Sequence, residues 1–168
     1  FGSIQPATQS GPRAFVASLS KWGSWNWVSM TTVGPGSSGG AMLGDIAVSS
    51  TGDIWVVGTF WLDIEWGQDL EVSNGGGVDG FVAKMSSSGG WDWGAPQGGV
   101  SNLDSMHGIT LDSNGDGYVV GSFEDHTYFG NTSRNIQKGQ DGYVVNLSDN
   151  IGGRTWEGVD LTAAYTME

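Results

Sequence analysis

The sequence predicts an all-β chain built from repeated antiparallel units, and three observations lead to this prediction. Two blocks recur: residues 15–19 match residues 81–85 and 143–147, and residues 45–60 match residues 108–123. Glycine makes up 30 of the 168 residues and falls between short apolar runs, which is typical of many tight turns. Long helical periodicity is absent. A fixed repeat of this kind indicates a supersecondary unit that buries its faces only against its neighbours.

The first two strands of a unit are clearest from residue 107 onward. Residues 109–111 place apolar side chains in alternation with a polar one, which predicts a strand. Residues 112–117 have the composition of a turn, and residues 118–123 form a β-branched and aromatic run. Two such strands around a short turn predict a β-hairpin.

The next two strands complete the unit. After a polar connection, residues 141–147 predict a third strand, and residues 154–157 predict a fourth that matches the tryptophan-containing residues 25–27 and 91–93. Four short antiparallel strands in about 60 residues predict one blade of a β-propeller. A β-solenoid or a β-sandwich is the alternative, although solenoid repeats are usually shorter and a sandwich need not repeat.

The repeat resembles a family of bacterial and archaeal β-propeller repeats, the seven-bladed-propeller-type repeats. The resemblance is carried by Asp79–Met85, by the hairpin sequence of residues 108–123, and by residues 128–130, with residues 64–67 at the same place one unit earlier. It implies a propeller blade whose innermost strand begins the hairpin and whose outermost strand carries the tryptophans. It implies no particular activity.

Counting units predicts a single propeller-like domain over residues 1–168, with about two and a half blades of four-stranded antiparallel sheets. The units span about residues 13–78 and 79–140, with a partial unit over residues 141–168. Closed propellers need about four to eight blades. We therefore expect this chain to be a fragment of a longer protein or part of an assembly.

The charge excludes several partners. Six lysines and arginines against 18 aspartates and glutamates give a net charge of −12. Nucleic-acid binding and attraction to an anionic membrane both need clustered cations, so neither is expected. No apolar run has the length of a membrane-spanning helix, and the absence of cysteine excludes disulfides. The acidic balance suits an extracellular or cell-surface protein.

A calcium site is the sharpest candidate for chemistry. Asp112, Asn114 and Asp116 alternate as in the first half of an oxygen-ligand calcium loop. The twelfth position of that loop is Phe123, however, and the matching turn at residues 49–53 lacks most of the acids. The alternative is a hairpin turn that uses aspartate, asparagine and glycine for their backbone conformations. No other cofactor is expected.

Nine tryptophans suggest carbohydrate binding, because sugars stack on indole faces. The pairs in residues 25–27 and 91–93 recur between units, which favours packing between blades. Trp61 and Trp66 do not follow that pattern and are the candidate ligand-binding residues.

Catalytic residues are sparse. His107 and His126 assemble no nucleophilic triad with other residues, and Asp63 with Glu65 is the pair that glycoside hydrolysis would use. The sequence therefore favours a non-enzymatic structural or binding scaffold, with a carbohydrate-binding module or part of a glycan-active enzyme as alternatives. The expected partners are protein or glycan. We expect self-association or docking of further blades through the inner strands around Ile46 and Ile109 and through the outer tryptophan strands.

Overall fold

The computed structural model describes residues 12–33, 37–66, 71–72, 77–99, 103–129 and 132–147. Within these ranges the chain forms strands, turns and bends but no helix, so the all-β prediction is confirmed. No described helix is long and apolar enough to cross a membrane. The strands are β1 (Phe15–Leu19), β2 (Trp25–Met30), β3 (Gly40–Val48), β4 (Ile54–Trp61), β5 (Ile64–Glu65), β6 (Glu71–Val72), β7 (Asp79–Met85), β8 (Trp91–Gly98), β9 (Ser105–Leu111), β10 (Gly117–Phe129) and β11 (Thr132–Leu147).

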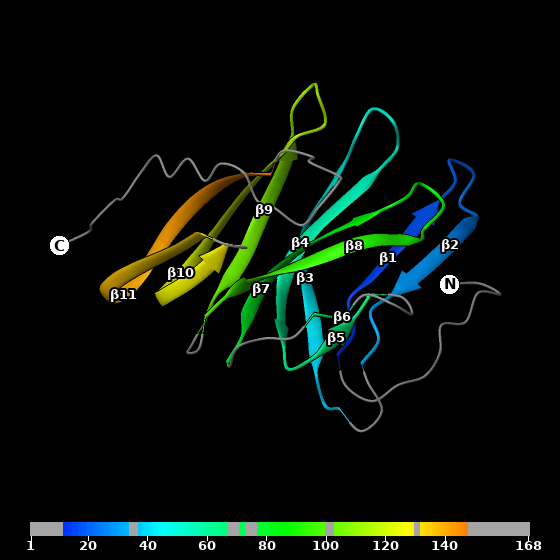
Figure 1. The fold of residues 1–168 in the computed structure, drawn as a ribbon. Coiled ribbons are helices and arrows are strands. Elements are labelled where there is room, and N and C mark those ends of the chain that lie inside the picture. The colour runs from blue at the N-terminus through cyan, green and yellow to red at the C-terminus, as the bar shows by residue number, and fades with distance from the viewer. Residues whose placement is uncertain are drawn as a thin grey trace.

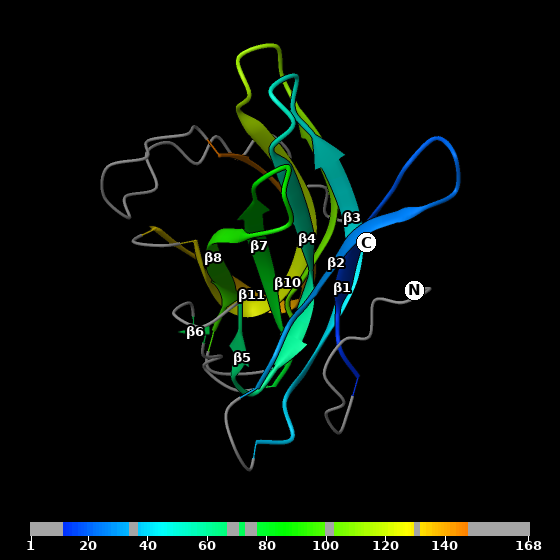
Figure 2. The ribbon, with the colours of Figure 1, turned by 90° about the vertical axis from the view of Figure 1, so that its right-hand side faces the viewer.

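Most strands belong to one curled antiparallel sheet (Figures 1 and 2). Its strand order is β11-β10-β8-β7-β4-β3, and β9 pairs with β10. Two short hairpins, β1–β2 and β5–β6, form separate two-stranded sheets. The predicted fourth strand at residues 154–157 lies outside the described residues.

The sheet divides into propeller-like blades, as predicted. The middle blade has the strand order β3-β4-β7-β8, so the tryptophan-bearing β8 lies at its outer edge. The last blade has the order β9-β10-β11 among the described residues. The hairpin β1–β2 corresponds to β7–β8 and is called the first half-blade here.

The pairing register repeats from blade to blade. Phe81 of β7 lies opposite Gly58 of β4, and Tyr143 of β11 lies opposite Gly121 of β10. Phe15 pairs with the outer strand of its hairpin in the same register as Phe81 does. The sequence matches therefore correspond to equivalent positions in space.

A β-bulge also recurs. The register between β3 and β4 shifts around Gly44, and the register between β9 and β10 shifts around the equivalent His107. Beyond the bulge, Ile46 lies opposite Val56 and Ile109 lies opposite Val119. Because a bulge changes which side chains share a face, its recurrence keeps the two blades in step.

Neighbouring blades are joined by two short antiparallel pairings, which we call the interblade bridges. Thr32, just after β2, exchanges two backbone hydrogen bonds with Glu65, of 2.9 and 2.8 Å. Gly98 of β8 pairs with Tyr128 of β10 at the equivalent place. The long β10 thus makes the sheet continuous from the middle blade to the last one, whereas the sequence predicted separate four-stranded sheets.

Two apolar clusters fill the spaces between blades. The first lies between the first half-blade and the middle blade, where Val16 packs with Val56, Phe81 and other buried side chains. The second lies between the middle and last blades, where Val57 and Ile109 are members. Each blade therefore depends on its neighbours for burial, as the repeat predicted.

Candidate functional site

A buried polar network lies in the last blade where it meets β8. The Tyr143 hydroxyl donates a hydrogen bond of 2.8 Å to Gln97 Oε1, and Gln97 Nε2 donates one of 2.6 Å to Thr127 Oγ1. The three residues come from β11, β8 and β10, and all are buried. The Tyr143 hydroxyl also lies 3.2 Å from the Ser105 carbonyl oxygen, which connects the network to β9.

Asp104 adds a buried charge beside this network. Its Oδ1 accepts a 3.0 Å hydrogen bond from the Glu124 N–H, while Oδ2 is buried and accepts none. Burial raises the pKa of Asp104 above its ordinary value, and this effect outweighs the hydrogen bond from Glu124. Burial also raises the pKa of Tyr143 well above its ordinary value, and the charge of Asp104 raises it further. Tyr143 is therefore a neutral donor at ordinary pH.

The equivalent positions one repeat earlier in the chain show that the fold does not require these polar residues. The positions of Asp104, Gln97, Thr127 and Tyr143 correspond by register to buried residues of lower polarity: Ala41, Thr31, Ile64 and Phe81. Gly80 makes room for Gln97, because a Cβ at position 80 would collide with Gln97 Oε1. The residue equivalent to Gly80 in the first half-blade is Ala14, so a Cβ is tolerated where Thr31 replaces Gln97. Burying polar groups is costly, so this network is a candidate for a role beyond packing.

An exposed serine–histidine cluster lies next to the network at the bulge of β9. His107 Nε2 lies 3.1 Å from both Ser105 Oγ and Ser122 Oγ, and the two hydroxyl oxygens are also 3.1 Å apart. A neutral imidazole in this position can take a proton from a serine hydroxyl. Among the described residues, no carboxylate bonds to the other ring nitrogen, so the acid that orients histidine in a triad is not seen.

Sequence reasoning considered His107 but missed its two serines. Ser105 precedes His107 by two residues on the same strand, and Ser122 is the register partner of Ser105 on β10. Only the pairing across the hairpin brings Ser122 close. The corresponding positions in the middle blade are Met42 and Thr59, so the cluster is particular to the last blade.

The candidate calcium turn has a hydrogen-bond pattern that four hairpins share. In each turn the side chain of the first residue accepts a hydrogen bond from the N–H of the fifth, at 3.1, 3.0, 3.2 and 3.0 Å. The fourth residue is always a glycine with a positive φ, of 81°, 90°, 88° and 93°. The turns are residues 20–24, 49–53, 86–90 and 112–116, and all lie toward the upper right of Figure 1.

This shared geometry bears on the calcium prediction. Asp112 Oδ1 accepts hydrogen bonds from the N–H groups of Asn114 (2.8 Å) and Asp116 (3.0 Å). The bond from the fifth residue is the one that a serine side chain accepts in the other three turns. The described residues contain no group of three or more histidine, cysteine, aspartate or glutamate side chains placed to hold a metal. The geometry favours the turn interpretation, and calcium at Asp112, Asn114 and Asp116 stays a prediction.

The two candidate ligand-binding tryptophans take different places. Trp66 is only 1% exposed, and its ring packs 4.6 Å from Phe81 and 4.5 Å from Trp91, centroid to centroid. It therefore has no exposed face for a sugar. Trp61 is half-buried at the end of β4, and its ring lies over Gly40, where a Cβ would be 2.3 Å from Trp61 Cζ2.

The most exposed tryptophan among the described residues was not one of the predicted ones. Trp22 is 82% exposed in the turn between β1 and β2, with the Lys21 ammonium 4.9 Å from its ring centroid. Its counterpart in the turn between β7 and β8 is Ser88. The criterion that selected Trp61, a tryptophan unique to one loop, also selects Trp22 when the turns are aligned.

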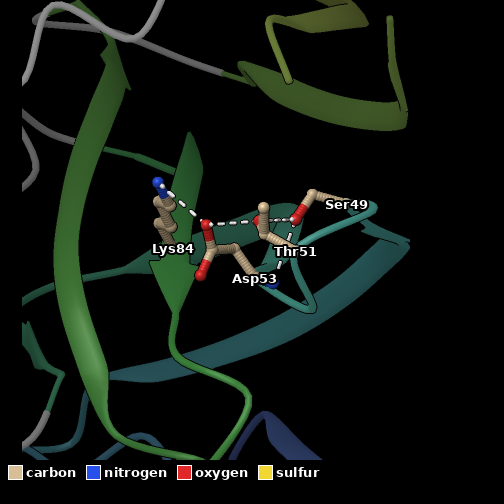
Figure 3. Close-up of polar contacts among 4 residues, drawn as sticks. All are labelled: Ser49, Thr51, Asp53 and Lys84. Atoms are coloured by element: carbon tan, nitrogen blue, oxygen red, sulfur yellow. Dashed lines mark hydrogen bonds and ion pairs between the residues drawn. The ribbon is translucent and has the colours of Figure 1, made fainter. Parts of the chain in front are cut away.

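A charged contact fixes the 49–53 turn to the sheet (Figure 3). Lys84 of β7 is buried, and its Nζ lies 3.6 Å from Asp53 Oδ2 and 5.4 Å from the centroid of the Trp55 ring. Thr51 Oγ1 donates to the same Asp53 oxygen at 3.2 Å, and Thr51 lies 2.8 Å from Ser49 Oγ. Every group in this cluster has a structural partner, which favours a stabilising role.

Comparison of the chain with protein-family models and with curated proteins finds no match, so function is inferred from these residues themselves.

Proposed function

We propose that this chain is a non-enzymatic segment of a β-propeller of the seven-bladed-propeller repeat type, and that it acts as a structural or binding scaffold. The proposal includes an extracellular or cell-surface location, which the acidic composition suits. Its partners are other proteins or further blades.

The observation that carries the proposal is an exposed apolar face on the last blade. Three large apolar residues of β10 and β11 are 37–44% exposed there: Tyr118, Val120 and Val144. The residues at the corresponding positions of the middle blade are 0–2% exposed because the last blade covers them: Trp55, Val57 and Val82. Because these residues are apolar and correspond to those of an internal interface, another blade could cover this surface in the same way.

One of the contact surfaces that the sequence suggested is already used within the chain. Ile109 is buried between the middle and last blades, so the surface around it is not available to a partner. The reason is that Ile109 faces the middle blade, whereas the opposite face of the same blade carries the exposed Val120.

Light scattering and sedimentation of the purified chain test this proposal. We expect concentration-dependent self-association, and we expect Val120→Lys to shift the chain toward monomer without lowering its melting temperature. Ser113→Lys is the matched control, because it adds the same charge at an exposed position in the turn before β10. A chain that stays monomeric at all concentrations, or a Ser113→Lys effect as large as that of Val120→Lys, would overturn the proposal.

Carbohydrate binding is the second candidate, and Trp22 is the observation that favours it. An indole ring exposed at a hairpin tip offers a face on which a sugar can stack. A glycan array on the chain and on Trp22→Ala tests it: binding that Trp22→Ala abolishes supports the lectin-like function, and no binding by the unchanged chain removes it. In the glycan-active alternative, Glu65 would act with Asp63. Glu65 Oε2 accepts a 3.1 Å hydrogen bond from Thr32 Oγ1, which gives that carboxylate a structural partner at the junction between blades.

A further inference from the structure

The serine–histidine cluster of β9 and β10 has the geometry of a nucleophile beside its base. His107 Nε2 lies 3.1 Å from Ser105 Oγ and 3.1 Å from Ser122 Oγ, within the range in which a base activates a hydroxyl. In the tautomer with its proton on Nδ1, the imidazole accepts a hydrogen bond from one of the two hydroxyls. The other hydroxyl can donate to the first, because the two oxygens are 3.1 Å apart. One serine oxygen thus has a proton acceptor on one side and a hydrogen-bond donor on the other.

The backbone holds this cluster in place. The Ser105 carbonyl oxygen lies 3.2 Å from the buried Tyr143 hydroxyl. The N–H of the preceding residue, Asp104, donates to the Val78 carbonyl oxygen at 2.8 Å. Ser122 is fixed opposite Ser105 by the pairing of β10 with β9. A nucleophile reacts faster when its surroundings hold it in one geometry beside its base, and the paired strands do this here.

The cluster is open to solvent, and a partner on the neighbouring apolar face would leave it open. His107 is exposed and the two serines are half-buried. In the middle blade, Met42 stands at the position of Ser105. Met42 is 57% exposed even though the last blade covers Val57 on the same face. A blade that covered Val120 would therefore leave Ser105 within reach of a small molecule.

We propose that this cluster is an acyl-acceptor site, which takes the acyl group of a small activated ester or thioester onto Ser105 or Ser122. The serine Oγ attacks the carbonyl carbon of the ester, and a carbon–oxygen bond forms. The bond from that carbon to the leaving group breaks, and the leaving group departs with the electron pair. The hydroxyl proton moves to His107 Nε2 and then to the leaving group, so the products are an acyl-serine, a neutral histidine and an alcohol or thiol. The inference goes beyond the proposed function and does not rest on it.

Reaction of the purified chain with p-nitrophenyl acetate tests this inference. The release of p-nitrophenolate gives the rate, and peptide mass spectrometry locates the acetyl group. We expect acetylation of Ser105 or Ser122. His107→Gln should slow this reaction by about 100-fold or more, because glutamine can hydrogen-bond to the serines but cannot take up their proton at neutral pH.

The chain contains a matched pair of hydroxyls that bond to each other and to no histidine among the described residues. Ser86 Oγ and Ser88 Oγ lie 2.9 Å apart in an exposed turn, and they should stay unmodified during the time in which the cluster reacts. Thr110→Ala changes an exposed position on the same strand as His107 and should leave the rate unchanged. Circular dichroism and melting temperature check that the variants are folded, and His107→Asn replaces His107→Gln if that variant is not.

A further variant separates the serines from the histidine. Ser105→Ala combined with Ser122→Ala keeps His107 and should lose the rapid release of p-nitrophenolate. Rapid release that persists in this double variant makes the imidazole itself the nucleophile and overturns the inference. The inference is also overturned if no acetyl group is found on either serine, if the control serines are acetylated equally fast, or if His107→Gln reacts as fast as the unchanged chain.

Discussion

Removing one hydroxyl group from the buried network should lower the free energy of unfolding more than the small size of the group suggests. Tyr143→Phe deletes the donor to Gln97 Oε1 and introduces the residue that Phe81 supplies at the equivalent position. Gln97 is 1% exposed, so its carbonyl oxygen would remain buried without a donor. Leaving such a group unsatisfied costs about 1–3 kcal/mol, so we expect the free energy of unfolding to fall by that amount.

Urea denaturation, followed by tryptophan fluorescence, measures this change. Tyr128→Phe is the matched control, because Tyr128 is exposed and the loss should stay within about 0.5 kcal/mol. In a Gln97→Leu background only the Ser105 carbonyl oxygen, 3.2 Å from the hydroxyl, remains as an acceptor. Tyr143→Phe should therefore cost less there, with a coupling energy of about 1 kcal/mol or more. A loss from Tyr143→Phe that is the same in both backgrounds would refute the reasoning.

Three further predictions follow from burial, charge and turn geometry. Phe81→Ala should lower the free energy of unfolding by about 3–5 kcal/mol, whereas Phe15→Ala, at the equivalent but exposed position, should cost less than half as much in the same urea titration. Burial raises the pKa of Asp104 in the folded chain, so the ionised carboxylate lowers stability at neutral pH and the protonated form below pH 3.8 does not. Asp104→Asn should therefore melt at a higher temperature than the unchanged chain at neutral pH, and the difference should vanish below pH 3.8. A difference in melting temperature that does not change with pH would contradict this. Millimolar calcium should leave the melting temperature unchanged, and a rise that Asp116→Ala abolishes would instead establish the calcium site.

The repeat made the fold predictable from sequence. The matches of Phe15 with Phe81 and Tyr143, and of Ile46 with Ile109, correspond to equal register positions because a strand's apolar period of two cannot slip without exposing its core face. The interblade bridges were not predicted, because the segments that form them are polar connections with no alternating pattern.

The candidate site was much harder to predict. Gln97, Thr127 and Tyr143 come from three strands, and each looks ordinary in its own segment. Their joint importance appears only when the pairing sets them beside each other. The burial of Trp66 could not be predicted for a related reason: a tryptophan in a connection can fold back into the core, and spacing along the chain carries no information on that direction.

The interblade bridges have a consequence for how the chain acquires its structure. Each bridge joins segments about 30 residues apart, as the Thr32–Glu65 and Gln97–Thr127 contacts do at separations of 33 and 30 residues. Closing such loops is far less demanding than bringing together remote ends of the chain. One blade can therefore be secured to the next as soon as its polar connection has emerged from the ribosome, and assembly can proceed in order along the polypeptide during synthesis.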